Sequence, residues 1–173
     1  MINGQPDLKG LYLKVFDLAK HTWRDICQDL LNIENTVFGD KADPELSSFF
    51  QNQDTVAVLL YEQKNNRIIG YIFAFPDTND DPQTVAHVDS VALLPEYQGK
   101  GLVVALNRRL EEELIEKGYQ FITMHVMIVN GYSEKIAKNY VERIVDSRDI
   151  ISKYGHGPQR YFKIKLDTVP LES

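Results

Sequence analysis

Two apolar stretches separated by one amphipathic helix pattern constrain the fold of this 173-residue chain more than any other feature. The first stretch is VAHVDSVALLP at 85–95, and the second is FITMHVMIV at 121–129. Between them, residues 99–117 carry leucines at every fourth position, and Gly118 is well placed to end a helix. Two strands joined by a single helix pair in parallel through a right-handed crossover. This segment therefore predicts a parallel strand–helix–strand unit.

The other segments predict an antiparallel sheet flanked by helices. Further strands are expected at 8–16, 54–62, 67–75 and 160–166, and further helices at 18–38, 44–52 and 130–145. The polar stretch QKNN between two of these strands has the composition of a hairpin turn. We therefore predict an α+β fold with a mixed, mostly antiparallel sheet, in a single domain that covers residues 1–173.

The charge and the cysteine count limit the class of protein. Acidic residues outnumber basic ones by 25 to 19, and the net charge of −6 argues against a general nucleic-acid-binding surface. The one cysteine, Cys27, cannot form an internal disulfide. The first ten residues lack a signal-peptide pattern, and no apolar run approaches the roughly 20 residues of a membrane helix. We therefore expect a cytoplasmic protein with neither nucleic acid nor membrane as a partner.

The stretch EYQGKGL, at 96–102, places two glycines where the central helix begins. A helix N-terminus offers unpaired backbone N–H groups and a partial positive charge, and glycines let an anion approach the backbone closely. A simple tight turn is the alternative interpretation. Two other phosphate motifs fit poorly. A P-loop needs GxxxxGK followed by Ser or Thr, whereas Gly101 is followed by Leu102, and Val104 stands where a dinucleotide fingerprint needs glycine.

The segment SVALLPEYQGKGL resembles motif A of the GCN5-related N-acetyltransferases (GNAT). That motif has Gln or Arg, two residues, Gly, one residue, and then Gly or Ala. The chain follows it from Gln98 through Gly101 and departs at Val103, where the family prefers a small residue. The predicted order of strands and helices also resembles the family order over nearly the whole chain.

The resemblance implies binding of acetyl-CoA, or of a related acyl-CoA, without a metal. It places the pyrophosphate on the backbone amides at the start of the helix, and the pantetheine arm along the main chain of the preceding strand. It also implies that an Asn, which follows the second parallel strand, hydrogen-bonds the cofactor arm, and that a small residue stands three positions later. The implied cofactor-binding residues are Val91, Ala92, Leu93, Gln98, Gly99, Lys100, Gly101, Leu102, Val103, Asn130 and Ser133.

The transfer reaction needs a base, because a protonated amine has no lone pair with which to attack a thioester. His87 and Asp89 lie two residues apart, on one face of the predicted strand, where members of the family often place a base or a proton relay. An unperturbed histidine titrates near neutral pH, so an ionisation is expected there. In the alternative interpretation, His87 is a hydrogen-bonded sheet residue and Asp89 a surface carboxylate. Tyr140 is the candidate acid for the departing thiolate, with Tyr132 as an alternative.

These observations predict an N-acetyltransferase that moves the acetyl group of acetyl-CoA to a primary amine. A non-catalytic acyl-CoA-binding module with the same fold is one alternative, and another phosphate ligand at the same helix start is a second. The acceptor stays open among a polyamine, an amino acid, an antibiotic, and a protein N-terminus or lysine. The donor is open between acetyl and longer acyl groups, and a homodimer is compatible with the sequence.

Overall fold

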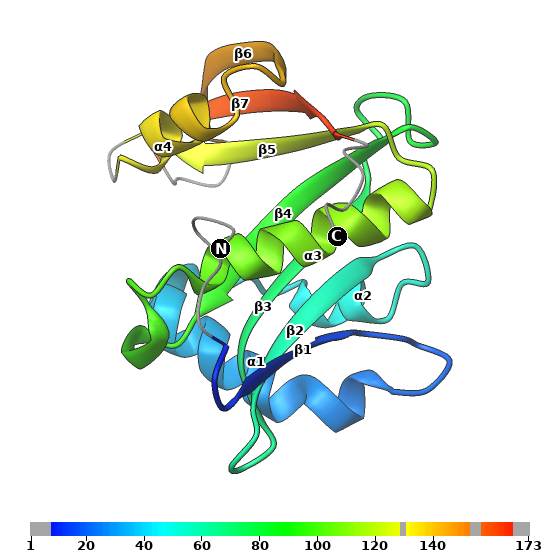
Figure 1. Cartoon of the computed structure of the whole chain (residues 1–173), viewed down its shortest axis with the longest axis vertical. Helices are drawn as coiled ribbons and strands as arrows, with labels where there is room; N and C mark the ends of the chain where they lie inside the picture. Colours follow the sequence, from blue (N-terminus) through cyan, green and yellow to red (C-terminus); the bar gives the residue numbers. More distant parts are fainter. Residues whose placement is uncertain (1–7, 129–130, 153–156, 168–173) are drawn as a thin grey trace. The chain divides into compact units, whose positions relative to one another are not determined.

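The structure is a computed structural model that describes residues 8–128, 131–152 and 157–167 (Figure 1). The strands are β1 (Leu11–Val15), β2 (Val56–Glu62), β3 (Arg67–Pro76), β4 (Val85–Leu93), β5 (Phe121–Met127), β6 (Ile144–Ile151) and β7 (Pro158–Lys165). The helices are α1 (Trp23–Phe38), α2 (Leu46–Phe50), α3 (Leu102–Glu116) and α4 (Tyr132–Asn139), with short 3-10 turns η1 (Gly39–Lys41) and η2 (Pro95–Tyr97). Over the described residues, the hydrogen-bonded strand order is β1-β2-β3-β4-β5-β7-β6. The predicted α+β class with a mixed sheet is confirmed.

The chain divides into two compact units. The first comprises residues 1–75 and 90–113, and the second comprises 76–89 and 114–173. Strand β4 and helix α3 each contribute residues to both units. The expectation of a single domain over the whole length stays a prediction.

In the first unit, β1, β2 and β3 lie side by side and pair antiparallel (Figure 1). The turn between β2 and β3 covers 63–66, as the hairpin composition predicted. Aromatic residues of α2 and β3 form the core of this unit: the Phe50 ring meets Tyr71 and Phe73 edge-on, and all three side chains are fully buried. The burial of large aromatic side chains such as these is a main contribution to the stability of a folded unit.

Helix α1 begins at Trp23 because the preceding residue caps it. The Asp25 carboxylate accepts hydrogen bonds from the Thr22 N–H (2.7 Å) and the Thr22 hydroxyl (3.1 Å). These contacts hold the first turn, and they lower the pKa of Asp25. The predicted start at residue 18 is therefore five residues early.

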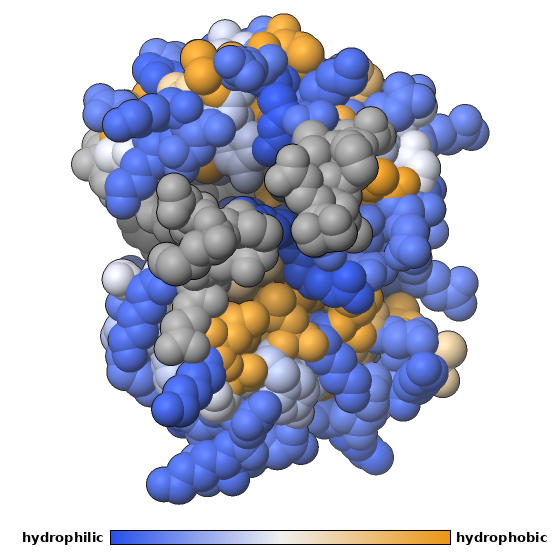
Figure 2. Space-filling model, in the orientation of Figure 1, coloured by the Kyte–Doolittle hydropathy of each residue, from blue (hydrophilic) through white to orange (hydrophobic). Residues whose placement is uncertain are grey.

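Hydrophobic side chains also reach the surface of the first unit. Figure 2 shows them gathered over β1 and β2, within a face that is otherwise largely hydrophilic. On β1, Leu11, Leu13 and Val15 alternate with Tyr12 and Lys14 and are half-buried. Residues two apart share one face of a strand, so β1 presents an incompletely covered apolar row.

The second unit is built on the first half of β4. This half pairs in parallel with β5 over three residues only, from Val85↔Phe121 to His87↔Thr123. Strand β5 then pairs antiparallel with β7 along its whole length, and β7 pairs with β6 (Figure 1). The parallel strand–helix–strand unit predicted from the sequence is confirmed.

The sequence analysis was wrong about the end of the helix predicted at 130–145. Helix α4 ends at Asn139, and Ile144–Ile151 forms strand β6. The stretch IVDSRDII is rich in β-branched residues, and pairing with β7 gives its backbone hydrogen-bond partners that a helix pattern cannot reveal. Helix α3 likewise begins at Leu102 rather than Gly99, because the glycines form the loop before it.

Candidate functional site

The loop between β4 and α3 has the backbone geometry that two glycines allow. We call residues 98–101 the glycine loop. Gly99 and Gly101 both adopt φ of 76°, a left-handed conformation that costs other residues about 1–2 kcal/mol. At Gly99 a Cβ atom would meet nothing within 4 Å, so the backbone angle, and not space, requires glycine there. The Gln98 side chain donates to the Leu93 carbonyl (2.9 Å) and closes the loop onto the end of β4.

The glycine loop leaves a run of backbone donors unpaired. Among the described residues, no backbone acceptor is found for the N–H groups from Gly99 to Val103, and Val104 is the first to donate, to Gly101 (3.1 Å). These N–H groups precede or open α3, a helix of 15 residues, whose N-terminus carries partial positive charge. At the loop, Leu102 is buried, and Gln98 and Lys100 are exposed. The arrangement is an anion-binding geometry.

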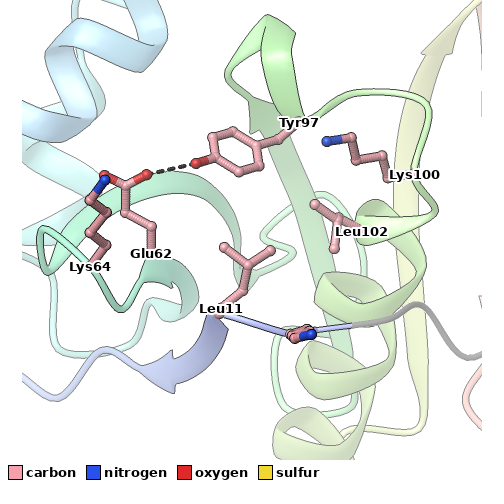
Figure 3. Close-up of a pocket in the computed structure, with 8 residues that line it drawn as sticks. Leu11, Glu62, Lys64, Tyr97, Lys100 and Leu102 are labelled. Atoms are coloured by element: carbon pink, nitrogen blue, oxygen red, sulfur yellow. Dashed lines mark hydrogen bonds between the residues drawn. The ribbon is translucent and has the colours of Figure 1, made fainter.

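A hollow of about 330 Å³ lies beside the glycine loop in the first unit (Figure 3). Its lining residues are Lys9, Gly10, Leu11, Glu62, Lys64, Tyr97, Lys100 and Leu102. Figure 3 shows Lys100 directed toward the ring of Tyr97, and the Lys100 ammonium lies 5.7 Å from the ring centroid. The three lysines give this hollow a basic rim.

Glu62 supports the wall of this hollow. Its carboxylate accepts hydrogen bonds from the Tyr97 hydroxyl (2.6 Å), the Asn65 amide (2.7 Å) and the Arg67 guanidinium (3.2 Å). Hydrogen bonds to the charged form, that of Tyr97 first, hold the pKa of Glu62 at about 2. The carboxylate is therefore ionised at neutral pH, and it fixes Tyr97 immediately before the glycine loop.

The end of β4 packs closely against β3 at a glycine. A Cβ atom on Gly70 would lie 2.4 Å from Leu93 Cδ2 and 3.0 Å from the Ala92 carbonyl oxygen. The pairing of β2 with β3 skips Ile69, which forms a bulge, and the Ile69 carbonyl instead accepts the Leu94 N–H (2.9 Å). The position of the Ala92 and Leu93 backbone therefore depends on the absence of a side chain at residue 70.

His87 lies in the second unit, half-buried on β4. Its Nδ1 lies 3.0 Å from the Thr123 hydroxyl, and that hydroxyl donates to Asp77 Oδ2 over 2.5 Å. Burial lowers the pKa of His87 to about 4; His125 acts in the same direction and Asp77 opposes it. The expected ionisation near neutral pH is therefore displaced into acid, because the ring is desolvated and has a second histidine beside it.

Two further residues lie near His87, His125 on β5 and Asp89 on β4. The His125 ring meets the His87 ring edge-on, with centroids 5.1 Å apart, and contacts Tyr161 on β7. Asp89 follows on β4 and is exposed. His87 and Asp89 both lie on β4, where alternate residues share a face.

The remaining predicted residues lie around α4. The Ser133 side chain is 1% exposed, and its hydroxyl has no hydrogen-bond partner among the described residues. Tyr140 caps the C-terminus of α4 and its ring lies 4.7 Å from the Arg143 guanidinium carbon. Asn130 and the side chain of Tyr132 lie outside the described part of the structure. The roles of these residues stay predictions.

Sequence reasoning missed four residues that build these surroundings. Thr123 contacts the candidate base and Asp77 contacts Thr123, while Glu62 and Tyr97 support the hollow. One signal was present for Thr123, a hydroxyl between the apolar Ile122 and Met124 of a strand. For Asp77, Glu62 and Tyr97, the hydrogen-bond partners lie too far away in the sequence to produce a local sequence pattern.

The described residues contain no group of three or more His, Cys, Asp or Glu side chains arranged to hold a metal ion. In the same part of the chain, no helix combines the length and the apolar character needed to cross a membrane.

Comparison with known proteins identifies the family. Residues 23–138, more than half of the chain, match the family described as "Acetyltransferase (GNAT) family". The chain belongs to the GNAT acetyltransferase family. The match includes the glycine loop, His87 and most of α4. No curated protein matches the sequence closely enough to be considered a relative.

Solved structures of GNAT proteins share the fold. The protein yncA from Salmonella typhimurium, solved with its cofactor acetyl-CoA, superposes with a TM-score of 0.67 at 17% identity, over 94% of this chain and 98% of that one. The ribosomal-protein-S18-alanine N-acetyltransferase from Escherichia coli gives 0.64 at 14% identity, over 94% and 98%. The aminoglycoside 6'-N-acetyltransferase from Enterococcus faecium gives 0.64 at 13% identity, over 92% and 99%. At these identities the likeness concerns the fold.

Proposed function

We propose that this GNAT protein transfers the acetyl group of acetyl-CoA to a primary amine. The observation that carries the proposal is the glycine loop, with two left-handed glycines and a run of unpaired N–H groups at the start of α3. This geometry suits a diphosphate, and the lysines of the neighbouring hollow supply positive charge for the nucleotide end of a coenzyme. That yncA was solved with acetyl-CoA supports the same cofactor here.

The backbone of residues 98–103 would hold the pyrophosphate, and the pantetheine would follow β4 near Val91, Ala92 and Leu93. Of these, Ala92 and Leu93 have buried side chains, so the groups offered to the cofactor are main-chain N–H and C=O. The unpartnered hydroxyl of Ser133 fits a polar group of the cofactor arm. The residues present therefore fit acetyl-CoA.

The reaction requires that an amine nitrogen attack the thioester carbonyl carbon, so that a C–N bond forms and the C–S bond breaks. We assign His87 as the base that removes the amine proton, directly or through a water, with Asp89 beside it to attract or orient the amine. With a pKa of about 4, His87 is neutral at pH 7 and so able to accept a proton. The Leu93 N–H is the candidate donor to the developing oxyanion, and Tyr140 the candidate acid for the thiolate.

The proposed reaction limits the acceptor to amines. The structurally similar proteins do not indicate which amine, because one is named for a ribosomal-protein alanine and another for an aminoglycoside. The net charge of −6 favours cationic acceptors through the summed field of the protein.

Binding of the cofactor is tested by calorimetry with acetyl-CoA and with free CoA. Gly101→Asp places a side chain and a negative charge against the pyrophosphate, and we expect it to abolish measurable binding. Gly118→Asp is the matched control, because Gly118 also has positive φ (94°) but lies at the other end of α3. Equal affinity of Gly101→Asp and the parent for CoA would contradict the assignment.

Catalysis is tested by thiol release from acetyl-CoA across a panel of amines. We expect His87→Ala to keep cofactor affinity and to lower turnover by ~100- to 10,000-fold. Cofactor binding without thiol release for any amine would instead favour a non-catalytic acyl-CoA-binding protein. Parental turnover in His87→Ala would show that the histidine is structural.

A further inference from the structure

Three side chains of the second unit form a continuous hydrogen-bonded chain that ends at His87. Asp77 is the first residue after β3, Thr123 lies on β5, and His87 lies on β4. Asp77 Oδ2 lies 2.5 Å from the Thr123 hydroxyl, which lies 3.0 Å from His87 Nδ1. The three residues come from separate segments, and the fold alone brings them together.

The direction of the hydrogen bonds follows from the number of protons available. The Thr123 hydroxyl has a single proton, which it donates to Asp77 Oδ2. The Thr123 oxygen is then an acceptor for the imidazole, and Nδ1 of His87 must carry the proton. In the neutral ring the basic lone pair is therefore at Nε2.

The inner part of this chain is buried. Thr123 is fully buried and Asp77 is 6% exposed. The other oxygen of Asp77 accepts the Asn79 N–H (2.9 Å), and no Lys or Arg of the described residues forms an ion pair with this carboxylate. A buried carboxylate without a cation is costly unless its hydrogen bonds are satisfied, so both of these contacts are needed in the folded protein.

We infer that Asp77 and Thr123 are positioning residues for His87, which hold its ring in the Nδ1–H tautomer and so direct the basic lone pair to Nε2. The inference deepens the proposed function and rests on it only for the role of His87 as the base. Neither residue touches the reacting atoms; each acts through the ring of His87.

The same chain affects the charged form of His87. When Nε2 gains the proton of the amine, both ring nitrogens carry hydrogen, and the positive charge is stabilised by Asp77 through the Thr123 hydroxyl. His125, which faces the ring from β5, and burial both oppose the charge. Asp77 therefore partly offsets the groups that weaken His87 as a base.

The loop after β3 provides its own control. Asp81 repeats the contacts of Asp77, since its carboxylate accepts the Gln83 N–H (3.0 Å) and the Thr84 hydroxyl (2.9 Å). That pair is exposed, and Thr84 lies outside the hydrogen-bonded chain that ends at His87. Thr84→Val and Asp81→Asn therefore remove the same kinds of hydrogen bond as Thr123→Val and Asp77→Asn, without acting on the histidine.

The test is the tautomer of His87, observed by two-bond ¹H–¹⁵N correlation spectra of the ¹⁵N-labelled full chain at neutral pH. The His87 signals are identified as those that His87→Ala removes. We expect the Nδ1–H pattern in the parent, in Thr123→Ser and in Thr84→Val, and a mixed or Nε2–H pattern in Thr123→Val. An Nε2–H ring in the parent would overturn the inference without any variant, and an unchanged Nδ1–H ring in Thr123→Val would also overturn it.

Kinetics separate this inference from the proposed function. We expect Thr123→Val and Asp77→Asn to lower kcat with unchanged acetyl-CoA affinity, by less than the ~100- to 10,000-fold expected for loss of the base itself, and Thr123→Ser to keep most of the turnover. If the tautomer changes as expected while His87→Ala keeps parental turnover, the positioning contact stands and the assigned base is wrong. If His87→Ala loses turnover while Thr123→Val keeps it, the base stands and the positioning role is wrong.

Discussion

The Tyr97 hydroxyl donates to Glu62 Oε2 over 2.6 Å and thereby ties the turn before the glycine loop to the end of β2. Tyr97 closes the 3-10 turn that follows β4, and Glu62 is the last residue of β2. The glycine loop is thus supported from a second strand, in addition to the bond from Gln98 to Leu93. Support of this kind preorganises backbone donors for an anion.

Loss of the Tyr97–Glu62 bond should change how stability depends on pH. The folded-state pKa of Glu62, about 2, lies below the ordinary value of 4.5, so its ionised form stabilises the protein fully above pH 4.5 and this contribution is lost as the pH falls toward 2. We expect Tyr97→Phe to lower the free energy of unfolding at pH 7 and to flatten its decline between pH 4.5 and 2, measured by urea unfolding. The effect of Tyr97→Phe should vanish in a Glu62→Gln background, and equal effects in both backgrounds would contradict the coupling.

Gly70→Ala should destabilise the protein by ~1–3 kcal/mol, because its Cβ atom would overlap Leu93 Cδ2 and press on the Ala92 carbonyl. The displaced main chain of β4 should also weaken acetyl-CoA binding. Urea unfolding and calorimetry measure the two effects. Leu93→Ala removes one of the two overlapping groups, so the double variant should lose less stability than the sum of the single variants. Strict additivity would show that the two residues do not compete for space.

His87 should make the protein more stable as the pH rises from 4 to 6.5. In this window the unfolded chain binds a proton at this histidine, whose ordinary pKa is 6.5, while the folded protein, with a pKa of about 4, does not. Protonation therefore favours unfolding, by about 3 kcal/mol across the window. His87→Gln should lack this dependence, and His21→Gln serves as a control for the loss of one histidine. An unfolding free energy of the parent that is flat between pH 4 and 6.5 would exclude the low pKa.

Tyr71→Phe should cost ~1–3 kcal/mol of stability, because its hydroxyl donates to Oε2 of the buried Glu34 carboxylate. The other Glu34 oxygen accepts the Asp43 N–H (2.8 Å) and would remain satisfied. Tyr12→Phe removes an exposed hydrogen bond to Asn66 and should change stability by much less. Similar losses of unfolding free energy in the two variants would mean that the burial of Glu34 does not strengthen its hydrogen bond with Tyr71.

The parts of the fold and site that could be predicted are those with local sequence signals. The two glycines before an amphipathic stretch located the start of α3 to within three residues, whereas their left-handed backbone angles were not predicted. The polar QKNN stretch predicted the turn between β2 and β3 for the same reason. The strand β6 was missed, because its hydrogen bonds come from β7 and the sequence before it continues a helical pattern.

The surroundings of His87 could not be predicted because they are assembled over long sequence distances. Thr123 is 36 residues from His87 and 46 from Asp77, and residues this far apart lie on different elements, so no pattern within one helix or strand relates them. The pKa of His87 depends on the same packing, since burial is its first cause. Residue type alone indicated a near-neutral base, whereas the folded environment produces a weaker one.

The loop from β3 to β4 should tolerate insertions less well than an ordinary surface loop. Loop tips usually accept insertions at small entropic cost. In this loop Asp77 bonds to Thr123, and Asp80 pairs with Lys163 (2.8 Å), so its start and its middle are fixed to other strands. A label or tag beside Asp77 would disturb its bond to Thr123 and, through Thr123, the contact with His87. The choice of attachment point for a spectroscopic probe or a fusion partner is therefore constrained by the Asp77 carboxylate, which acts on His87 through Thr123.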